Sequence, residues 1–374
     1  MAERDAGRDV PSTIRADVAV PEAATVVARC RRGLEGLLGD ELAAAGLAVA
    51  AVAPGAVRLG GGAPLAALTA ARLWLTVGIE LPLAADAKGT GAAGDADATL
   101  PARLAATLAA PPTRALLTAL TDGPVRWRLA LGGAGHRRAV VWRAAQAVRA
   151  AAPELINDPK ATTWDVVVDA ARTTVELRPH KLDDPRFAWR VADVPASSHP
   201  TVAAALARLA GARADDVVWD PFCGSGAELI ERARLGPWRR LVGSDLDDRA
   251  LAAARANLAA AGLADRAELI RADALAHDPG GVTLIITNPP LGRRIRGDAA
   301  ALLEQFVTRA ARLLAPDGRL VWITPAVRRT HDAAIRAGLY RDVHHIVDLG
   351  GYDGDLEVWR PTSGLARGRH RPAS

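Results

Sequence analysis

Residues 217–229 read VVWDPFCGSGAEL, a short apolar run followed by a glycine-rich turn and the start of a helix. Glycine at Gly224 and Gly226 lets the backbone bend sharply directly after a strand and come close to a ligand. A helix that begins at such a turn presents free backbone N–H groups. This strand–turn–helix unit predicts an α/β fold that binds a ligand where its strands end.

The same order of strand and helix continues toward the end of the chain. Candidate strands lie at 217–219, 241–243, 268–270, 284–286 and 320–323, and helices fit between most of them, for example at 248–261 and 300–314. Such alternation predicts a doubly wound parallel sheet. The runs 343–349 and 356–359 would add a terminal hairpin, which makes the expected sheet mixed and seven-stranded.

Three acidic residues follow three consecutive predicted strands. Asp220, Asp245 and Asp273 would therefore meet at one edge of the sheet. Asp245 is placed to accept hydrogen bonds from ribose hydroxyls, and Asp273 is placed to face an adenine amino group. Asp220 would repel a pyrophosphate, and Leu229 stands where a dinucleotide fingerprint has its third glycine. These features favour S-adenosylmethionine over a nucleoside phosphate.

A second motif, Asn288-Pro289-Pro290-Leu291, ends the fourth strand. The prolines remove backbone donors and stiffen the loop. The Asn288 amide oxygen and the neighbouring carbonyls can accept hydrogen bonds from an exocyclic amine. This arrangement would point the amine lone pair toward a methyl donor.

Together these motifs resemble the class I methyltransferase domain of RNA guanine-N2 methyltransferases, above all the group with an N-terminal THUMP domain. The likeness covers roughly residues 24–360 and includes Pro195–Thr201 ahead of the core. Three positions differ from the usual pattern: Leu291 replaces an aromatic residue, Ala227 a threonine and His199 an arginine.

The resemblance implies a role for each matching residue. It assigns the S-adenosylmethionine site to Thr201, Asp220, Pro221, Phe222, Cys223, Gly224, Gly226, Asp245, Leu246, Asp273, Ala274 and Asn288. It assigns the methyl-accepting site to Asn288, Pro289, Pro290 and Leu291.

The expected domain order follows from the same comparison and from local composition. We expect an α+β ferredoxin-like plus THUMP region ahead of a Rossmann-like methyltransferase domain. The segments are a flexible leader (1–22), a ferredoxin-like domain (23–85), a linker (86–99), a THUMP-like RNA-binding domain (100–190), a connecting helix (191–210), the methyltransferase domain (211–361) and a basic tail (362–374).

An uneven charge distribution points to RNA. The net charge is only +5, yet no acidic residue lies between Gly123 and Pro153, a stretch that holds six arginines. Arginine binds phosphate bidentately, so this stretch predicts an RNA contact, whereas Trp127 and Trp142 are expected in the core. The arginines singled out for RNA are Arg126, Arg128, Arg137, Arg138 and Arg143, with Arg293 and Arg294 beside the Asn-Pro-Pro loop.

Composition limits the other classes of protein. The chain has 374 residues, of which half are hydrophobic, so it can bury several cores. Two cysteines are too few for a disulfide scaffold or a cysteine-rich zinc module, and we expect no metal site. No segment has the pattern of a secretion signal or the apolar length of a membrane span. We expect a cytoplasmic monomer with no membrane partner.

The predicted activity is methyl transfer from S-adenosylmethionine to the exocyclic N2 of a guanosine in structured RNA, with tRNA as the first candidate. Ribosomal RNA and adenine N6 are alternative targets, because Asn-Pro-Pro suits several exocyclic amines. An RNA-binding protein with weakened catalysis is a second alternative, which Leu291 supports. A nicotinamide dehydrogenase would leave the Asn-Pro-Pro motif unexplained.

Overall fold

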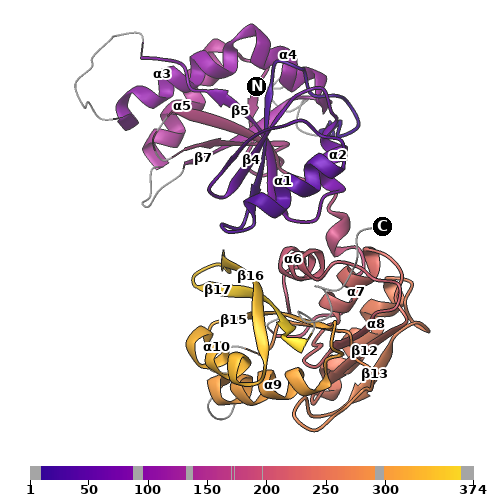
Figure 1. Ribbon diagram of the computed structural model, residues 1–374. Coiled ribbons are helices and arrows are strands. Elements are labelled where there is room, and N and C mark those ends of the chain that lie inside the picture. Colours follow the sequence, from indigo (N-terminus) through magenta and orange to yellow (C-terminus); the bar gives the residue numbers. More distant parts are fainter. Residues whose placement is uncertain are drawn as a thin grey trace, which may run out of the picture. The chain divides into compact units, whose positions relative to one another are not determined.

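The computed structural model describes residues 10–86, 96–131, 138–169, 171, 173–195, 197–290 and 299–363. It divides into two compact units. The first unit is Met1–Cys30 with Leu38–Asp184, and the second is Arg31–Leu37 with Pro185–Ser374. Each unit is built on its own large β-sheet (Figure 1).

The first unit contains an eight-stranded sheet with the order β3-β4-β2-β5-β10-β9-β7-β8. β7 runs parallel to β8 and β9, and all other neighbours in this sheet are antiparallel. The strands are β2 (Thr25–Cys30), β3 (Val49–Ala53), β4 (Ala56–Gly60), β5 (Trp74–Pro82), β7 (Arg126–Leu131), β8 (Ile156–Asn157), β9 (Trp164–Val168) and β10 (Thr174–Pro179).

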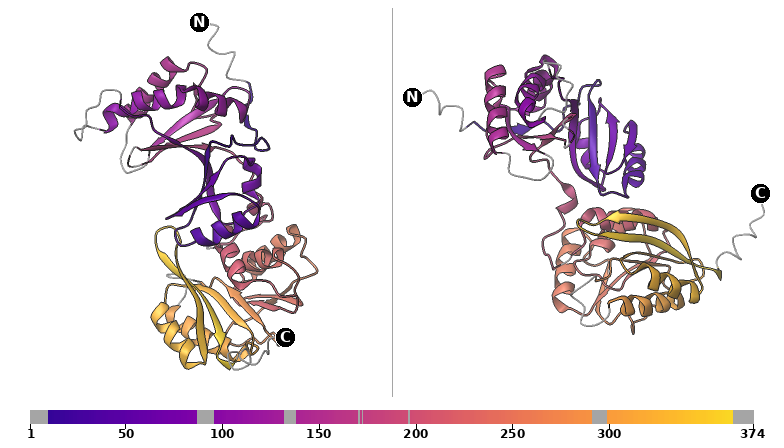
Figure 2. Two further views of the ribbon diagram at one scale, coloured as in Figure 1. Left: turned by 45° about the horizontal axis from the view of Figure 1, so that its top comes forward. Right: turned by 90° about the vertical axis from the view of Figure 1, so that its left-hand side faces the viewer.

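Pairing of β5 with β10 joins the predicted ferredoxin-like and THUMP-like regions into one sheet. The two regions are therefore parts of one compact unit and not two separate sheets. Helices α3 and α5 pack side by side in this unit (Figures 1 and 2). The helices are α1 (Glu35–Ala44), which begins among the residues of the second unit, α2 (Leu65–Thr69), α3 (Ala96–Ala109), α4 (Pro111–Ala119) and α5 (Arg138–Ala151).

Two predicted irregular segments prove to be partly ordered. The expected leader contains β1 (Thr13–Ile14), which pairs with β6 (Thr121–Asp122), and Val20 is fully buried. The prediction of a flexible leader is thus wrong for residues 10–22, because backbone pairing to a distant segment orders them. α3 already begins at Ala96, inside the expected linker, whereas residues 87–95 lie outside the described part.

The second unit contains the predicted seven-stranded mixed sheet, with the order β13-β12-β11-β14-β15-β17-β16. Five strands are parallel, and β17 runs antiparallel to both of its neighbours. The strands are β11 (Val217–Asp220), β12 (Arg240–Asp245), β13 (Glu268–Arg271), β14 (Leu284–Thr287), β15 (Arg319–Thr324), β16 (Leu339–Asp348) and β17 (Asp353–Pro361).

The chain order reverses between β11 and β14, which are neighbours in this sheet. From β11 the chain builds outward through β12 to β13, and it then returns to β14 and builds in the opposite direction. Ligands of open α/β sheets bind at such a switch point, outside the carboxyl ends of the strands. The helices of this unit are α6 (Pro200–Ala210), α7 (Ala227–Arg234), α8 (Asp248–Ala260), α9 (Ala299–Leu313) and α10 (Val327–Arg336), with a short 3-10 helix at Pro185–Phe187.

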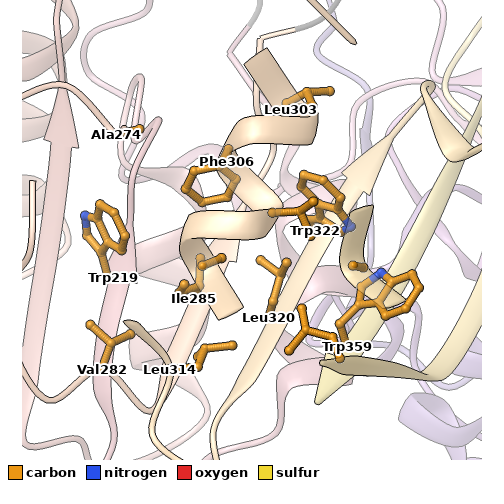
Figure 3. Packing of buried hydrophobic residues seen from close by; sticks show 14 of the residues in the cluster. Trp219, Ala274, Val282, Ile285, Leu303, Phe306, Leu314, Leu320, Trp322 and Trp359 are labelled. Atoms are coloured by element: carbon orange, nitrogen blue, oxygen red, sulfur yellow. The ribbon is translucent and has the colours of Figure 1, made fainter. Parts of the chain in front are cut away.

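A dense aromatic core supports this sheet. The Phe306 ring of α9 lies between Trp219 of β11 and Trp322 of β15, with centroid distances of 6.2 Å to each (Figure 3). All three side chains are fully buried. Phe222 of the glycine loop also stacks edge-on against Phe306, at 5.2 Å. The loop is thus anchored to the core directly below it.

The predicted connecting helix is shorter than expected and belongs to the second unit. α6 covers Pro200–Ala210 and packs against α7 and β15. His199, which replaces the usual arginine, caps this helix, because its Nδ1 accepts a hydrogen bond from the Thr201 backbone N–H. No helix in the described part of the chain is long and apolar enough to cross a membrane.

Candidate active site

The ends of the parallel strands bring the predicted residues to one edge of the second sheet. Asp220 is the last residue of β11 and Asp245 the last of β12. Asn288 directly follows β14, and Asp273 follows β13 by two residues. Asp220 and Asn288 therefore occupy the two strand ends that flank the switch point, as expected for a ligand site.

The glycine loop needs both glycines for its conformation. Gly224 and Gly226 have φ values of 49° and 84°, in the left-handed region that favours glycine. The Gly224 N–H donates a hydrogen bond of 3.0 Å to Asp245 Oδ2, which ties the loop to the end of β12. A Cβ at Gly224 would meet no described atom closer than 3.9 Å, so the backbone is accessible on that side.

A contact from α8 also holds the loop in place. The Asn257 amide of α8 donates to the Ser225 carbonyl at 3.0 Å, and its Oδ1 accepts from the backbone N–H groups of Val191 and Ala192.

Cys223 is buried, and burial followed by the charge of Asp220 raises its thiol pKa well above the usual value. Cys223 is therefore a small neutral packing residue rather than a nucleophile.

Asp220 is the most perturbed acid of the site. Its side chain is fully buried, and Oδ1 accepts hydrogen bonds from the Thr287 hydroxyl at 2.7 Å and the Phe222 N–H at 3.2 Å. Oδ2 is buried and has no hydrogen-bond partner among the described residues. Burial, and then the charge of Glu228, raises the pKa of Asp220 well above its usual value. A carboxylate in this position calls for a cationic partner.

A series of hydrogen bonds that the sequence motifs do not reveal reaches Asn288. Asn288 Nδ2 donates to Ser198 Oγ at 2.9 Å, and Ser198 Oγ donates to Glu228 Oε1. Asn288 Oδ1 is buried and has no partner in the described part of the chain. Glu228 had one sequence signal, an acid at the start of the otherwise apolar AELI turn of α7. Ser198 lies in the segment Pro195–Thr201 that carries the family resemblance, but no role was assigned to it, and Asn257 had no sequence signal.

The remaining predicted donor-site residues differ in exposure. Thr201 is fully buried, and its Oγ contacts His199 Nδ1 at 2.8 Å, while Asp273 is exposed and accepts from the Leu275 N–H at 2.8 Å. Leu246 is 62% exposed and Ala274 is buried. The Asn-Pro-Pro motif has Pro289 buried and Pro290 exposed, Pro221 is buried beside Asp220, and Leu291 lies outside the described residues.

The predicted RNA-binding arginines separate into three groups. Arg126 is 2% exposed and ion-paired with Asp158 at 2.9 Å, so its assignment to RNA is wrong: its charge is buried and neutralised. Arg128 is paired with Asp165, which compensates its charge. Arg138 and Arg143 are exposed on α5. Residues outside the described part are Arg137, Arg293 and Arg294.

The two tryptophans of the arginine-rich stretch also differ. Trp127 is buried in the first sheet, as predicted. Trp142 is 64% exposed, so the prediction of a core position is wrong for this residue. Trp142 lies on α5 between Arg138 and Arg143, whereas the buried stripe of this helix is Val140, Ala144 and Val148. A helix presents one face to the core, and Trp142 is on the other.

The site as a whole fits an organic cation better than a metal ion. The described residues contain no group of three or more His, Cys, Asp or Glu side chains placed to hold a metal. Two buried acids, Asp220 and Glu228, interact electrostatically at this site, and burial raises the pKa of each. An ammonium or sulfonium group would relieve the cost of ionising Asp220.

Comparison with known families agrees with this geometry. Residues 188–351 match the family described as RMKL-like, methyltransferase domain. Residues 25–79 match the RlmL ferredoxin-like domain. The first match covers the glycine loop, the acids at the strand ends and the Asn-Pro-Pro motif.

Individual relatives extend the comparison. The chain is 35% identical over 178 residues to a tRNA (guanine(10)-N2)-dimethyltransferase of Methanothermobacter thermautotrophicus, covering 46% of this chain and 49% of the relative. It is 32% identical over 190 residues to a tRNA (guanine(6)-N2)-methyltransferase of Archaeoglobus fulgidus, covering 44% and 48%. The chain thus spans about half the length of these curated relatives.

A solved structure is similar over almost the whole chain. The crystal structure of TrmN from Thermus thermophilus superposes with a TM-score of 0.73 and 25% identity, covering 90% of this chain and 99% of that one. Fold, strand-end residues and family matches agree with one another. The chain carries an RlmL-type ferredoxin-like domain and a class I methyltransferase domain of the RMKL-like family.

Proposed function

We propose that this protein transfers a methyl group from S-adenosylmethionine to the exocyclic N2 of a guanosine in structured RNA, with tRNA as the first candidate. The observation that carries the proposal is a pair of buried oxygens at the switch point, Asp220 Oδ2 and Asn288 Oδ1, neither of which has a hydrogen-bond partner among the described residues. Asp220 Oδ2 suits a cationic methyl donor, and Asn288 Oδ1 suits the amine that accepts the methyl group. The names of the curated tRNA relatives support guanine N2 and tRNA.

The residues of the glycine loop and of the neighbouring strand ends would hold the donor. Asp220 Oδ2 is available for the ammonium group, and the Gly224 backbone leaves room for the methionine part. Asp245 and Asp273 lie at strand ends where ribose and adenine would be held. When bound, S-adenosylmethionine supplies an electrophilic methyl group on a sulfonium.

Asn288 would hold the methyl acceptor. Its free Oδ1 accepts one N–H of the exocyclic amine, which orients the nitrogen lone pair away from that bond. The new bond joins this nitrogen to the methyl carbon as the carbon–sulfur bond breaks. The nitrogen then loses a proton, and no strong base is needed for that step. The guanosine would have to leave its stack to reach the pocket.

The exposed side of α5 is the surface that we propose for RNA. Arg138, Trp142, Arg143 and Arg149 are all exposed on this helix. None of the three arginines makes an ion pair with another described residue, so their charges are available for phosphates. Trp142 offers a ring face for stacking. A THUMP-like role for residues 100–190, a monomeric state, a cytoplasmic location and the absence of a membrane partner remain proposals.

Two measurements test the proposed function. Calorimetry should detect S-adenosylmethionine binding, and Asp245→Ala should weaken it at least tenfold, because the variant removes the anchor of Gly224 and the ribose contact. Transfer of labelled methyl groups to total RNA from a strain that lacks this protein, followed by nucleoside identification, should yield N2-methylguanosine. The control is Asn157→Ala, since the Asn157 side chain lies in the first unit and donates to the Trp127 carbonyl.

Asn288→Ala should retain donor affinity and lose transfer by about 100-fold or more, within the range for a group that orients the reacting atoms. An absence of donor binding would refute the methyltransferase reading. N6-methyladenosine as the product would shift the target to adenine, and label in ribosomal RNA alone would shift the RNA. Donor binding and RNA binding without any transfer would favour a weakened, RNA-binding protein.

A further inference from the structure

Ser198 joins two parts of the site that lie far apart in the sequence. Its hydroxyl accepts a hydrogen bond from Asn288 Nδ2 at 2.9 Å and donates one to Glu228 Oε1. Ser198 is 8% exposed and Glu228 is 3% exposed, so water has little access to either bond. The segment before α6, the first turn of α7 and the end of β14 therefore meet at one hydroxyl group.

The single hydroxyl proton of Ser198 fixes the donor and the acceptor in both of these hydrogen bonds. Ser198 has one O–H, and a carboxylate can only accept, so Glu228 takes that proton. The Ser198 oxygen can then only accept from its other neighbour, which must present an N–H. The Asn288 amide is thus held with Nδ2 toward Ser198, and its buried Oδ1 has no partner in the part of the chain that the structure describes.

We propose that Ser198 and Glu228 are positioning residues that fix the orientation of the Asn288 amide, so that its oxygen rather than its NH2 group receives the methyl-accepting amine. The inference rests on the proposed function, because only an amine substrate makes this orientation matter. An amide turned by 180° would present two N–H donors to the N–H groups of the substrate and would repel them.

The surroundings of Glu228 are consistent with an acceptor role. The pKa of Glu228 lies above its usual value because burial raises it more than the Ser198 hydrogen bond and the positive charge of Arg190 lower it. The acceptor role therefore rests on geometry: the Ser198 hydroxyl donates to Glu228 Oε1. Asp220 also interacts electrostatically with Glu228. Arg190 also donates to the Ser198 carbonyl, which holds the backbone of this residue beside Glu228. Ser198 is thus held beside Glu228 through both its hydroxyl and its backbone.

The asparagine content of the chain makes the orientation directly measurable. Only three asparagines occur, Asn157, Asn257 and Asn288, so ¹⁵N-asparagine labelling gives three side-chain NH2 signals. Asn288→Ala identifies one signal, and Asn257 serves as an internal reference because its NH2 donates to two carbonyls. We expect wild-type protein to show a protected Asn288 NH2 group in a single environment.

Variants of Ser198 separate orientation from folding. Ser198→Ala should leave the Asn257 signal in place but make the Asn288 NH2 protons exchange with water at least tenfold faster. Ser198→Thr keeps the hydroxyl and should restore protection. Ser197→Ala is the matched control, since the Ser197 hydroxyl donates to the Val194 carbonyl outside this chain of bonds. Glu228→Gln should broaden or split the Asn288 signal, and Glu231→Gln on the same helix should not.

Kinetics then connects the orientation to transfer. At saturating donor and RNA, Ser198→Ala should lower the single-turnover transfer rate about tenfold, with donor affinity changed less than twofold and with recovery in Ser198→Thr. An unchanged Asn288 signal in Ser198→Ala, or an undiminished transfer rate, would overturn the proposal while the proposed function stands. A different result would separate the two proposals. If Ser198→Ala loses the protection of the Asn288 NH2 group but the wild-type protein methylates no RNA, the proposed function is overturned and the positioning of Asn288 by Ser198 still holds.

Discussion

Asp216 and Asp220 lie at the two ends of β11, both fully buried, and their pKa values shift in opposite directions. Burial raises the pKa of Asp216, but hydrogen bonds from Arg319 and Arg232 outweigh burial and lower it. Asp220 faces Glu228 instead of a cation, so burial and charge both raise its pKa. One aspartate therefore stabilises the fold, whereas the other is held in an unfavourable state at the ligand site.

We expect Asp220→Asn to flatten the dependence of stability on pH. Because the folded-state pKa is raised, the stability that Asp220 contributes is full below its unfolded pKa of about 4. That stability is lost as the pH rises through the raised folded-state pKa. Between pH 5 and pH 8 the wild type should therefore lose unfolding free energy relative to the variant.

Urea unfolding of the ligand-free protein at the two pH values measures this difference. If the unfolding free energies of wild type and Asp220→Asn change equally between the two pH values, ionisation of the Asp220 carboxyl does not destabilise the folded protein, and the prediction is wrong. The variant should also bind S-adenosylmethionine more weakly. That result would show that the carboxyl that destabilises the folded protein is the one that binds the methyl donor.

At the scale of the element, a buried ion cluster holds β11, α7 and β15 together. Asp216 Oδ2 lies 2.7 Å from Arg232 and 2.8 Å from Arg319, and all three side chains are buried. Arg319 also donates to the Ala210 carbonyl at the end of α6. The strand that carries Asp220 is thus fixed at its opposite end by charge pairing.

Asp216→Asn should destabilise the protein by about 3 kcal/mol or more, because it leaves two buried guanidinium groups without their counter-charge. The lowered pKa predicts that the contribution of Asp216 is present at neutral pH and is lost as the pH falls. Chemical denaturation at pH 7 measures the loss. Asp317→Asn is the matched control, since Asp317 pairs with Arg213 at an exposed position and should cost under about 0.5 kcal/mol.

Local pattern was sufficient for most elements of the second unit. The predicted helix 248–261 corresponds to α8, Asp248–Ala260, and the predicted strand 284–286 lies within β14, Leu284–Thr287. Apolar periodicity reports burial within one element, so these elements can be predicted from sequence. β1 could not be predicted, because two residues become a strand only through pairing with β6, over a hundred residues away.

At the scale of the whole molecule, the proposed RNA surface and the transfer site lie in different units. Substitutions on α5 should therefore change RNA affinity without changing donor affinity. We expect the double variant Arg138→Ala with Arg143→Ala to weaken RNA binding and to reduce the slope of log affinity against log salt by about 2, one for each phosphate contact.

Filter binding over a range of salt concentrations, with calorimetry of the donor in parallel, tests this separation. Arg114→Ala is a suitable control, because Arg114 is also exposed but is paired with Glu154. A slope that does not change would mean that the α5 arginines contact solvent only.

The sequence by itself determined the glycine loop, the acids at three strand ends and the Asn-Pro-Pro motif. These depend on short-range chemistry: glycine's left-handed backbone, and the rule that parallel strands end at one edge. Tertiary structure decided which side chains are free to act. It paired Arg126 with Asp158, exposed Trp142 and joined Ser198, Glu228 and Asn288. Hydrogen bonds and ion pairs between residues 30 to 90 positions apart have no periodic signature, so only the folded chain reveals them.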